Sequence, residues 1–481
     1  MNSKPLRGID AITLNAYFFS LNVQTLTLVP LLTPILVERF FSAELKGSAL
    51  GTLRLVSLML GLLVHTVAAQ LSDRCHSRFG RRRPFMIVSL FLEILALIGM
   101  GLIVNHLEGS LATTLLFATI VFLMAISNFG FGPAQGLIPD LVPLNQHGKV
   151  SSIKALFELP LPVIFVSFTI AKLLSGGNIW GVIWVLIAVK LVCAVITLFI
   201  REEPIPRSAT PFDKDSLWRL LAMTLIFTAV IILLGLGARH ALPLIKTSFS
   251  QLRLFKWLSA GMGVIMMIVA VVIGVLTSTR ISLGTDTKGR RSFSWWVINR
   301  LAFLVGASNL AGFVLYFLQE RFPTLTRETA AQPTAILMMV IGLSLLVAAA
   351  TAGWLTDKLG PKPLLFISGI LAFVACIVVV FSNTLLVVYI GAAVIGVASG
   401  IFYSANWALG TQLVPKDEAG RWLGISNIAG AGAGAIGAFI GGPIGDNAGY
   451  AVLMVVYGVL FLLSTLALTG IKLPGLKSRQ N

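Results

Sequence analysis

Seven ionisable side chains interrupt the long apolar stretches of this sequence. They are Arg54, Glu93, Lys154, Glu158, Lys172, Lys190 and Arg300. A charged side chain at the centre of a bilayer costs about 2.5–3.5 kcal/mol on insertion scales, so such residues are functional candidates by default. We expect Lys172 and Arg300 to lie near helix ends, where long side chains reach the interface, and the others to lie deeper.

Glu158 is the first candidate for proton coupling. Burial favours the neutral form of a carboxyl group and a nearby base favours the ionised form, so a pairing that changes during a cycle moves a proton. Lys154 precedes Glu158 by one helical turn, and Pro160 follows it and permits a kink. Asp140 and Glu93 are the next candidates, and Arg54 is expected to reach Glu93. A purely structural ion pair is the alternative for each.

A basic cluster adjoins one acidic side chain in the segment 72–85. Asp73 is followed by Arg74, Arg78, Arg81 and Arg82. We interpret these five residues, together with Asp357 and Lys358 of a similar later segment, as a cytoplasmic gate. Asp140 ends the fourth span on the same side, and both Asp73 and Asp140 are expected to be paired and ionised beside so many guanidinium groups. The alternative is a basic anchor that only orients the chain in the membrane.

The apolar stretches predict fourteen membrane-spanning helices. Of all residues 57% are apolar and 11% are charged, against about 25% charged in soluble domains. A helix needs about 20 apolar residues to cross the hydrocarbon core, and backbone groups in lipid must be paired within their own segment. The expected spans are 11–37, 48–71, 84–105, 111–140, 150–174, 179–200, 217–237, 257–278, 295–318, 333–356, 363–382, 384–412, 421–445 and 449–471.

Loop charges predict the orientation of these helices. The net charge is +17, and the lysines and arginines gather in alternate short loops, which is the positive-inside pattern and not a nucleic-acid surface. Both termini are therefore expected in the cytoplasm, with the chain in the plasma (inner) membrane. The loop 239–256 disagrees because it carries four basic residues on the expected outer face, so twelve full spans plus a hairpin is the alternative topology.

Enzyme signatures are absent from the sequence. It has no Gly-x-x-x-x-Gly-Lys-Ser/Thr loop for a nucleotide and no His/Cys/Asp cluster for a metal. We expect no enzymatic activity, no cofactor and no metal site.

Two segment pairs indicate an internal repeat. The segment 69–84 is similar to 353–363, where Asp357 and Lys358 correspond to Asp73 and Arg74, and 141–153 is similar to 413–425. Both pairs occupy equivalent connections in two sets of six spans, as in transporters built from repeats. The expected domains are an N-terminal six-helix bundle over 1–200, a cytoplasmic loop plus two inserted helices over 201–294, and a C-terminal six-helix bundle over 295–481.

The segment 72–85, Ser-Asp-Arg-Cys-His-Ser-Arg-Phe-Gly-Arg-Arg-Arg-Pro-Phe, resembles a lengthened form of the Gly-x-x-x-Asp-Arg-x-Gly-Arg-Arg loop of the major facilitator superfamily. With Gly132-Pro133 and Asp140-Leu141, it is similar to the sucrose transporters and the glycoside–pentoside–hexuronide cation symporters. The sequence departs from that group at Ala69, where glycine is preferred, and in its two additional helices.

The resemblance implies a major facilitator fold, in which the Asp–Arg loop latches the bundles on one side. It also implies a substrate cavity lined by the first, fourth, seventh and tenth helices of a twelve-helix scheme. Polar and aromatic residues there are the cavity candidates: Asn22, Gln24, Asn128, Gln135, Asn309, Tyr316, Tyr403, Asn406 and Trp407.

The expected function is secondary active transport of a small polar solute, a sugar or glycoside, coupled to protons by alternating access. The expected partners are the solute, the lipid bilayer and protons or another cation, with no nucleic acid, and the expected state is a monomer. One alternative is a proton-driven exporter of amphiphilic compounds, which the fourteen-helix count favours. The other is a protein of this fold that assists assembly of pigment–protein complexes.

Overall fold

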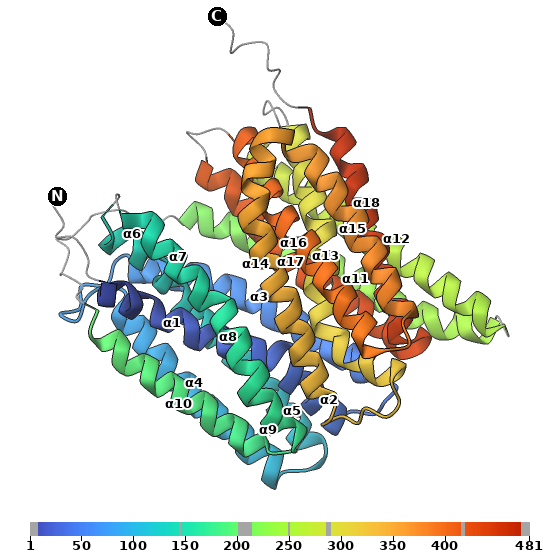
Figure 1. Ribbon diagram of the computed structural model, residues 1–481, viewed down its shortest axis with the longest axis horizontal. Coiled ribbons are helices and arrows are strands. Elements are labelled where there is room, and N and C mark those ends of the chain that lie inside the picture. Colours follow the sequence, from blue (N-terminus) through green and yellow to red (C-terminus); the bar gives the residue numbers. More distant parts are fainter. Residues whose placement is uncertain are drawn as a thin grey trace, which may run out of the picture. The chain divides into compact units, whose positions relative to one another are not determined.

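The computed structural model of the chain describes residues 8–143, 146–200, 214–248, 251–284, 290–414 and 419–472 (Figure 1). These residues form helices joined by short connections, and no strand occurs among them. Both chain termini, and with them the predicted cytoplasmic ends, lie outside the described residues, as does the stretch 201–213 of the predicted cytoplasmic loop.

The first six predicted spans are confirmed as helices, some of them in several segments. They are α1 (Gly8–Thr27) with η1 (Leu28–Leu32) and α2 (Thr33–Phe40), α3 (Lys46–Ser72), α4 (Arg83–His106), α5 (Gly109–Gln135) with α6 (Leu137–Leu141), α7 (His147–Glu158) with α8 (Pro160–Phe165), η3 (Val166–Ile170) and α9 (Ala171–Ser175), and α10 (Ile179–Leu198). Prolines account for several breaks, because a proline lacks the N–H that would continue the helical ladder.

The other eight predicted spans are also helices. They are α11 (Lys214–Ser248), α12 (Leu252–Leu283), α13 (Arg290–Arg321), α14 (Ala331–Leu359), α15 (Pro361–Phe381), α16 (Leu385–Leu413), α17 (Ala419–Ala448), and α18 (Tyr450–Leu466) with η5 (Ala467–Gly470). In the described part of the chain, 13 helical segments are long and apolar enough to cross a membrane. The protein is an all-α, multi-pass integral membrane protein.

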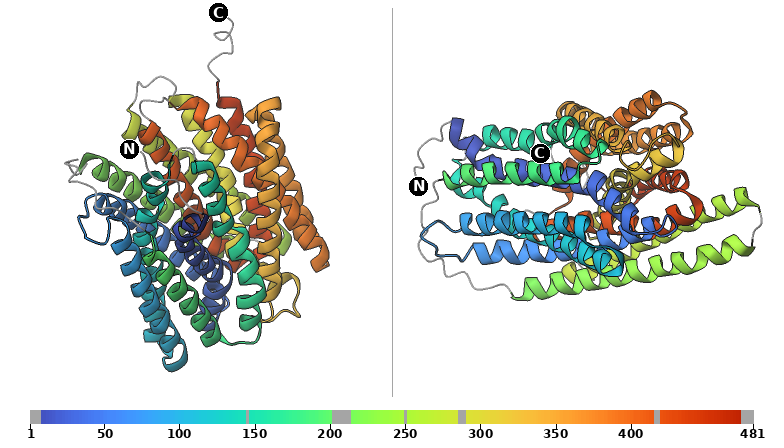
Figure 2. Two further views of the ribbon diagram at one scale, coloured as in Figure 1. Left: turned by 60° about the vertical axis from the view of Figure 1, so that its left-hand side comes forward. Right: turned by 90° about the horizontal axis from the view of Figure 1, so that it is seen from below.

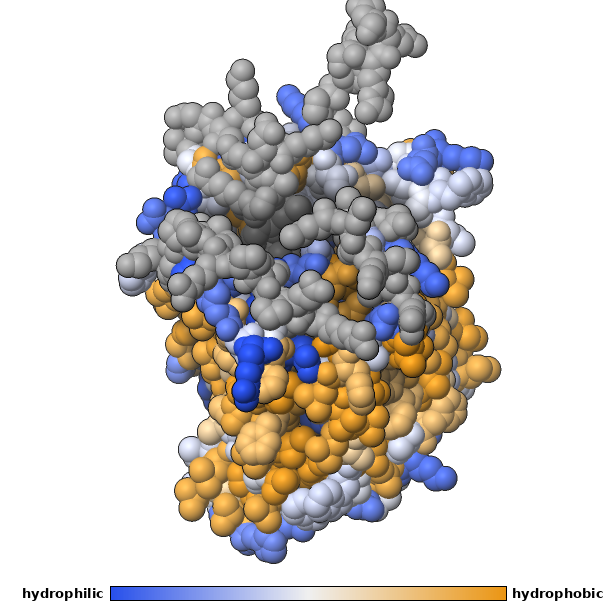
Figure 3. Space-filling model, turned by 90° about the vertical axis from the view of Figure 1, so that its left-hand side faces the viewer, coloured by the Kyte–Doolittle hydropathy of each residue, from blue (hydrophilic) through white to orange (hydrophobic). Residues whose placement is uncertain are grey.

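Hydrophobic side chains also cover much of the surface. Figure 3 shows one face on which apolar residues form a broad continuous area, with hydrophilic residues towards its two ends. Exposed apolar side chains such as Phe91, Trp184 and Phe381 belong to this kind of surface, since they are 60%, 58% and 69% exposed. A surface of this kind is stable against lipid tails and unfavourable in water.

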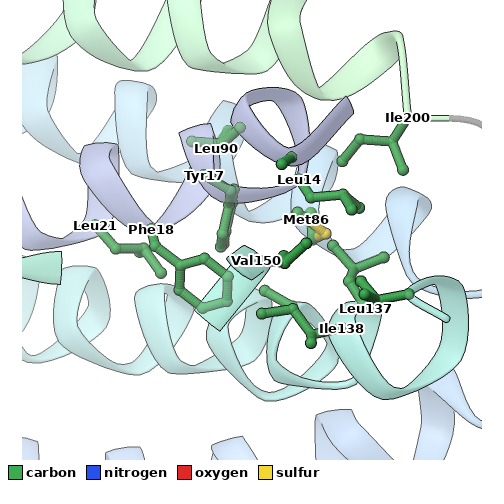
Figure 4. Close-up of a cluster of buried hydrophobic side chains, with 13 residues drawn as sticks. Leu14, Tyr17, Phe18, Leu21, Met86, Leu90, Leu137, Ile138, Val150 and Ile200 are labelled. Atoms are coloured by element: carbon green, nitrogen blue, oxygen red, sulfur yellow. The ribbon is translucent and has the colours of Figure 1, made fainter. Parts of the chain in front are cut away.

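One compact unit comprises Met1–Ser42, Val56–Leu220 and Phe322–Met339. Its core includes a cluster in which α1 contributes Tyr17 and Phe18, α4 contributes Met86, and α6 and α7 contribute Leu137 and Val150 (Figure 4). These side chains are at most 2% exposed. The helix α1 contacts α7, α8 and α10, so the first helix lies at the centre of this unit.

The second compact unit comprises Ala43–Leu55, Leu221–Arg321 and Val340–Asn481. Its most buried helix is α13, which contacts α12, α16, α17 and α18. The predicted division into 1–200, 201–294 and 295–481 stays a prediction.

The two helices predicted as an insertion belong to this second unit, α11 from Leu221 onwards and α12 entirely. The helix α12 contacts α13, α17 and α18, and the ring of Phe227 from α11 lies in the space left by Gly274 of α12 and Gly432 of α17. Figure 2 shows α11 and α12 side by side along their length.

The predicted loop over 239–256 is wrong. Helix α11 continues to Ser248 and α12 begins at Leu252, so Arg239, Lys246, Arg253 and Lys256 are all helical. Nothing in the sequence breaks the helix before residue 248 except Pro243, which α11 accommodates. The basic residues therefore mark the ends of two unusually long helices, 35 and 32 residues in length, and not a long loop.

Candidate functional site

Arg82 joins two carboxylates where α3 connects to α4. Its guanidinium lies 2.5 Å from Asp73 Oδ1, and its Nε donates to Asp140 Oδ2 at 3.0 Å. It also donates to Ser72 Oγ at 2.6 Å, and its side chain is only 7% exposed. One buried arginine therefore holds together the end of α3, the start of α4 and the short helix α6.

Arg81 and Gly136 complete this arginine network. Arg81 forms an ion pair with Asp140, and its Nε donates to Asp140 Oδ2 at 3.2 Å. A Cβ at Gly136 would overlap the Arg82 guanidinium, so only glycine leaves room for it. The predicted pairing of Asp73 and Asp140 with the basic cluster is confirmed. The central place of Arg82 among three consecutive arginines has no signal in the sequence.

The other arginines of the predicted gate make different contacts. Arg78 lies with its Cζ 4.8 Å from the centre of the Phe79 ring. The backbone N–H of Arg74 donates to the Leu71 carbonyl at 3.2 Å, which continues the last turn of α3. Their gating role stays a prediction.

The repeated motif at the end of α14 forms no equivalent network. Asp357 and Lys358 are exposed, and Lys358 Nζ lies 3.8 Å from the centre of the Trp354 ring. Within the described ranges, Asp357 has no ion pair. The similarity of the two segments in sequence is therefore not matched by similar contacts.

Glu93 pairs with Lys190, which joins α4 to α10. The two side chains are 0% and 1% exposed, and Lys190 Nζ donates to Glu93 Oε2. Ser89 Oγ lies 2.7 Å from Glu93 Oε1 and 2.7 Å from the Ile126 carbonyl, and its single proton serves one of them. The Tyr17 hydroxyl donates to Ser89 Oγ at 3.4 Å. Glu93 is thus a fully buried, charge-compensated group.

Arg54 does not reach Glu93, and that prediction is wrong. Its guanidinium donates to Asn309 Oδ1 at 3.0 Å and to the Ser308 carbonyl at 3.2 Å, both on α13. Gly312 leaves the space for this guanidinium, because a Cβ there would overlap Arg54 Nη1. Arg54 belongs to the stretch of α3 that clusters with α13, so it faces that helix.

Lys154 and Glu158 form the predicted pair on one turn of α7. Lys154 Nζ lies 3.3 Å from Glu158 Oε1, with the side chains 23% and 35% exposed. Lys154 Nζ also lies 4.5 Å from the centre of the Phe18 ring. Glu158 is the last residue of α7, Leu159 has non-helical dihedrals (φ −129°, ψ −69°), and α8 begins at Pro160. The break predicted at this proline is confirmed.

Glu158 lies deep within its span. Helix α7 begins at His147, so at about 1.5 Å per residue Glu158 is about 16 Å along the helix. This is deeper than the sequence alone indicated, because α7 starts earlier than residue 150. Unlike Glu93, Glu158 combines this depth with a partly exposed carboxylate.

The four cavity candidates of the first unit have unequal environments. Asn22 and Asn128 donate to carbonyls of their own helices, at 2.8 and 2.9 Å. Gln24 Nε2 donates to Ser127 Oγ at 2.6 Å and so links α1 to α5, while Gln135 is exposed at the end of α5. Gln24 is thus engaged in helix packing, and the other three keep side-chain groups for a ligand.

The candidates of the second unit fall in two places. Asn309 is fully buried and holds Arg54, and Tyr316 is buried with Lys46 Nζ 4.5 Å from its ring centre. Asn406, Tyr403 and Trp407 lie together on α16, with Asn406 buried and the two aromatic residues 38% and 47% exposed. The structure brings these three together beside Arg300 of α13.

Arg300 is a functional candidate that the sequence placed wrongly near a helix end. Helix α13 begins at Arg290, so Arg300 is about 15 Å along it. Its Nη1 donates to Asn406 Oδ1 at 3.0 Å, and its Cζ lies 5.7 Å from the centre of the Trp407 ring. Arg290 and Arg291 could have indicated from the sequence where this helix begins, because basic residues mark the interface end of a span.

Metal ligation has no support in the residues that the structure describes. Among them no group of three or more His, Cys, Asp or Glu side chains gathers in a way that could hold a metal ion. The chemistry available at the sites above is therefore charge pairing, hydrogen bonding and stacking on aromatic rings.

Comparison with solved structures decides the fold. A crystal structure of a POT family transporter in complex with 5-aminolevulinic acid has a TM-score of 0.65 to this chain at 16% identity, covering 95% of this chain and 94% of the other. Residues 311–480 match the Major Facilitator Superfamily profile. The chain has the major facilitator fold.

Two curated relatives share shorter regions with this chain. The Membrane-associated transporter protein of Mus musculus is 29% identical over 137 residues, 26% of this chain and 24% of that protein. The Proton-associated sugar transporter A of Homo sapiens is 39% identical over 80 residues, 17% of this chain and 10% of that protein. The chain thus spans a quarter or less of the length of these relatives. All these similar proteins are transporters, not enzymes.

Proposed function

We propose that this protein is a secondary active transporter that moves a small polar solute by alternating access, coupled to protons. The observation that carries the proposal is the Lys154–Glu158 pair, which is partly exposed at a helix break inside a span of a major facilitator fold. A sugar or glycoside is the proposed solute class. It is supported by the regional similarity to a protein named as a proton-associated sugar transporter.

The coupling step proceeds through a change of partner. While Lys154 lies 3.3 Å away, the Glu158 carboxylate has a positive group beside it as counter-charge. A movement at the α7–α8 break that turns the Glu158 side chain away from Lys154 removes its counter-charge, and the loss of a counter-charge favours the neutral form of a carboxyl group. A proton is then bound on one side of the membrane and released when the pair re-forms.

Orientation and assembly form part of the same proposal. We place the arginine network of Arg81 and Arg82 on the cytoplasmic side of a plasma (inner) membrane, with both termini on that side and the protein as a monomer. The support is the positive-inside distribution of charge. Export of amphiphilic compounds remains the second candidate, because α11 and α12 add two long apolar helices to the twelve of the sugar carriers.

Uptake into proteoliposomes tests the function. A panel of labelled sugars and glycosides is offered to purified protein with and without an inward proton gradient. We expect at least one solute to accumulate above equilibrium with the gradient, and only to equilibrate without it. If no solute of the panel is taken up and an amphiphilic dye is expelled in a proton-driven way, the protein is instead an exporter.

Glu158→Gln separates coupling from binding. The amide cannot release a proton, so gradient-driven accumulation should be lost while exchange of labelled for unlabelled solute continues. The matched control is Glu328→Gln, which removes an almost equally exposed carboxylate from a pair outside the spans. If Glu158→Gln accumulates solute at the wild-type level, the coupling role passes to Asp140 or Glu93, and Glu158 is only a structural partner of Lys154.

A further inference from the structure

Arg300 carries a charge that the described part of the chain does not compensate. Its polar contacts are one hydrogen bond, from Nη1 to Asn406 Oδ1 at 3.0 Å, and the Trp407 ring. Its Nε is buried without a hydrogen-bond partner. A guanidinium group has five N–H donors, so most of the binding capacity of Arg300 is unused.

Three other basic groups inside the described spans have polar partners. Lys190 has Glu93 and Lys154 has Glu158 as counter-charges. Arg54 also has no carboxylate partner in the described ranges, but two of its nitrogens bind the α13 groups Asn309 Oδ1 and Ser308 O. An arginine within a span is costly unless it meets a counter-charge or a water-filled cavity. Within the described ranges, Arg300 therefore differs from Lys190 and Lys154 in having no counter-charge, and from Arg54 in making one hydrogen bond where Arg54 makes two.

The hydrogen bonds behind Arg300 fix its position before any ligand binds. Asn406 Nδ2 donates to Asn299 Oδ1 at 3.1 Å, and Asn299 Nδ2 donates to the Ser464 carbonyl at 2.9 Å. Trp296 Nε1 donates to the Asn406 carbonyl at 2.9 Å. Asn406 is held from two sides, so its Oδ1 presents a fixed acceptor to the guanidinium. Such support is typical of a preorganised binding site.

The open side of Arg300 is aromatic. Trp407 and Tyr403 are 47% and 38% exposed on the same helix as Asn406, which is itself fully buried. A flat ring beside a cation gives a small organic molecule an apolar face to stack on and a charge to bind.

We propose that Arg300, Asn406 and Trp407 form a binding site for an anionic group of the transported solute, a carboxylate or phosphate on a small polar molecule such as a sugar acid or sugar phosphate. The inference rests on the proposed function and narrows it to anionic solutes. The anion supplies the missing counter-charge to Arg300, while its polar body lies against Trp407. A lipid phosphate has the same anionic chemistry, so the experiment separates the two sources.

Matched probes test the charge preference. Purified full-length protein in phosphatidylcholine nanodiscs is heated in concentration series of glucuronate, glucose 6-phosphate and glucose, and an apparent Kd is taken from the rise in Tm. We expect at least one of the two anions to bind at least about tenfold more tightly than glucose. Arg300→Gln should weaken the binding of that anion about 10- to 100-fold and leave the binding of glucose unchanged.

Three further variants keep the test decisive. Arg300→Lys keeps the charge and should retain part of the preference, since a lysine cannot form the same paired contacts. Trp407→Leu changes a residue that is 47% exposed and leaves the charge of Arg300 in place, and it should weaken binding of the anion. Lys172→Gln removes an exposed positive charge from α9 and should change nothing. Equal binding of anions and glucose by the wild type, or an unchanged preference in both Arg300→Gln and Trp407→Leu, overturns the proposal.

Two further measurements distinguish a soluble anion from a lipid phosphate, and distinguish failure of this inference from failure of the proposed transport function. Phosphatidylglycerol added to the nanodiscs should not compete with the soluble anion. If phosphatidylglycerol competes with the soluble anion, and this competition disappears in Arg300→Gln, the site binds a lipid headgroup and the proposal of an anionic solute is overturned. Gradient-driven uptake of a neutral sugar without any anion binding would overturn this inference and leave the proposed transport function standing.

Discussion

Glu93→Gln, with Lys190 retained, is expected to lower the free energy of unfolding by about 3–5 kcal/mol, because it leaves a buried ammonium group without its counter-charge. The pair is 0% and 1% exposed, so water cannot compensate for the loss. Lys190→Met should destabilise the protein similarly, since it leaves the carboxylate alone. The measurement is thermal unfolding of the purified variants in detergent.

The double variant distinguishes pairing from a requirement for charge as such. Glu93→Gln combined with Lys190→Met removes both charges and keeps the side chains close in volume, so it should recover most of the stability lost in each single variant. Arg327→Gln is the partly exposed control, because Arg327 and Glu328 are 35% and 36% exposed and their pair should contribute no more than about 1 kcal/mol. Additive losses in the double variant would contradict a direct pairing.

Arg82→Ala is expected to abolish transport and to destabilise the α3–α4 connection more than any other arginine variant there. Arg82 contacts Asp73, Asp140 and Ser72 from a side chain only 7% exposed, whereas Arg81 contacts Asp140 alone and is 21% exposed. Arg82→Lys should rescue little, because one ammonium group cannot reproduce the forked geometry that joins two carboxylates. Solute uptake and the amount of membrane-inserted protein are measured together.

Variants of neighbouring residues compare how much each residue contributes to this arginine network. Asp73→Asn and Arg81→Ala should impair uptake while insertion remains intact, and Gly136→Ala should resemble Arg82→Ala because its Cβ would displace the guanidinium. The exposed Lys358→Ala at the repeated motif should have a smaller effect. Normal uptake by Asp73→Asn, Arg81→Ala and Arg82→Ala together would reduce the loop to a signal for membrane orientation.

Local relations were predictable from the sequence, whereas of the relations between distant spans only the pairing of Asp140 with the basic cluster was predicted correctly. Lys154 and Glu158 are four residues apart on one helix, so helix geometry alone brings them together. Lys190 and Glu93 are 97 residues apart, and no periodicity within a span tells which of several helices it faces. Arg54 was assigned to the wrong partner for this reason.

The distance of a polar residue from the ends of its helix decides whether it is placed deep in a span or near its end. The spans were located by apolar runs, which end where charged residues begin, but α13 and α11 continue through Arg290 and Lys246. Arg300 was therefore placed too near an end, and the basic residues around 239–256 were interpreted as a loop. Helical backbone satisfies its own hydrogen bonds, so a helix can extend past the hydrocarbon core wherever no residue breaks it.

The most direct test of the central claim, that solute and proton move together, is a record of internal pH in proteoliposomes loaded with a pH-sensitive dye. The solute that accumulates in the uptake panel is added outside without any imposed gradient. The account predicts that wild-type vesicles acidify as the solute enters and that Glu158→Gln vesicles take up solute without acidifying. Solute entry with no pH change in wild-type vesicles would contradict proton coupling.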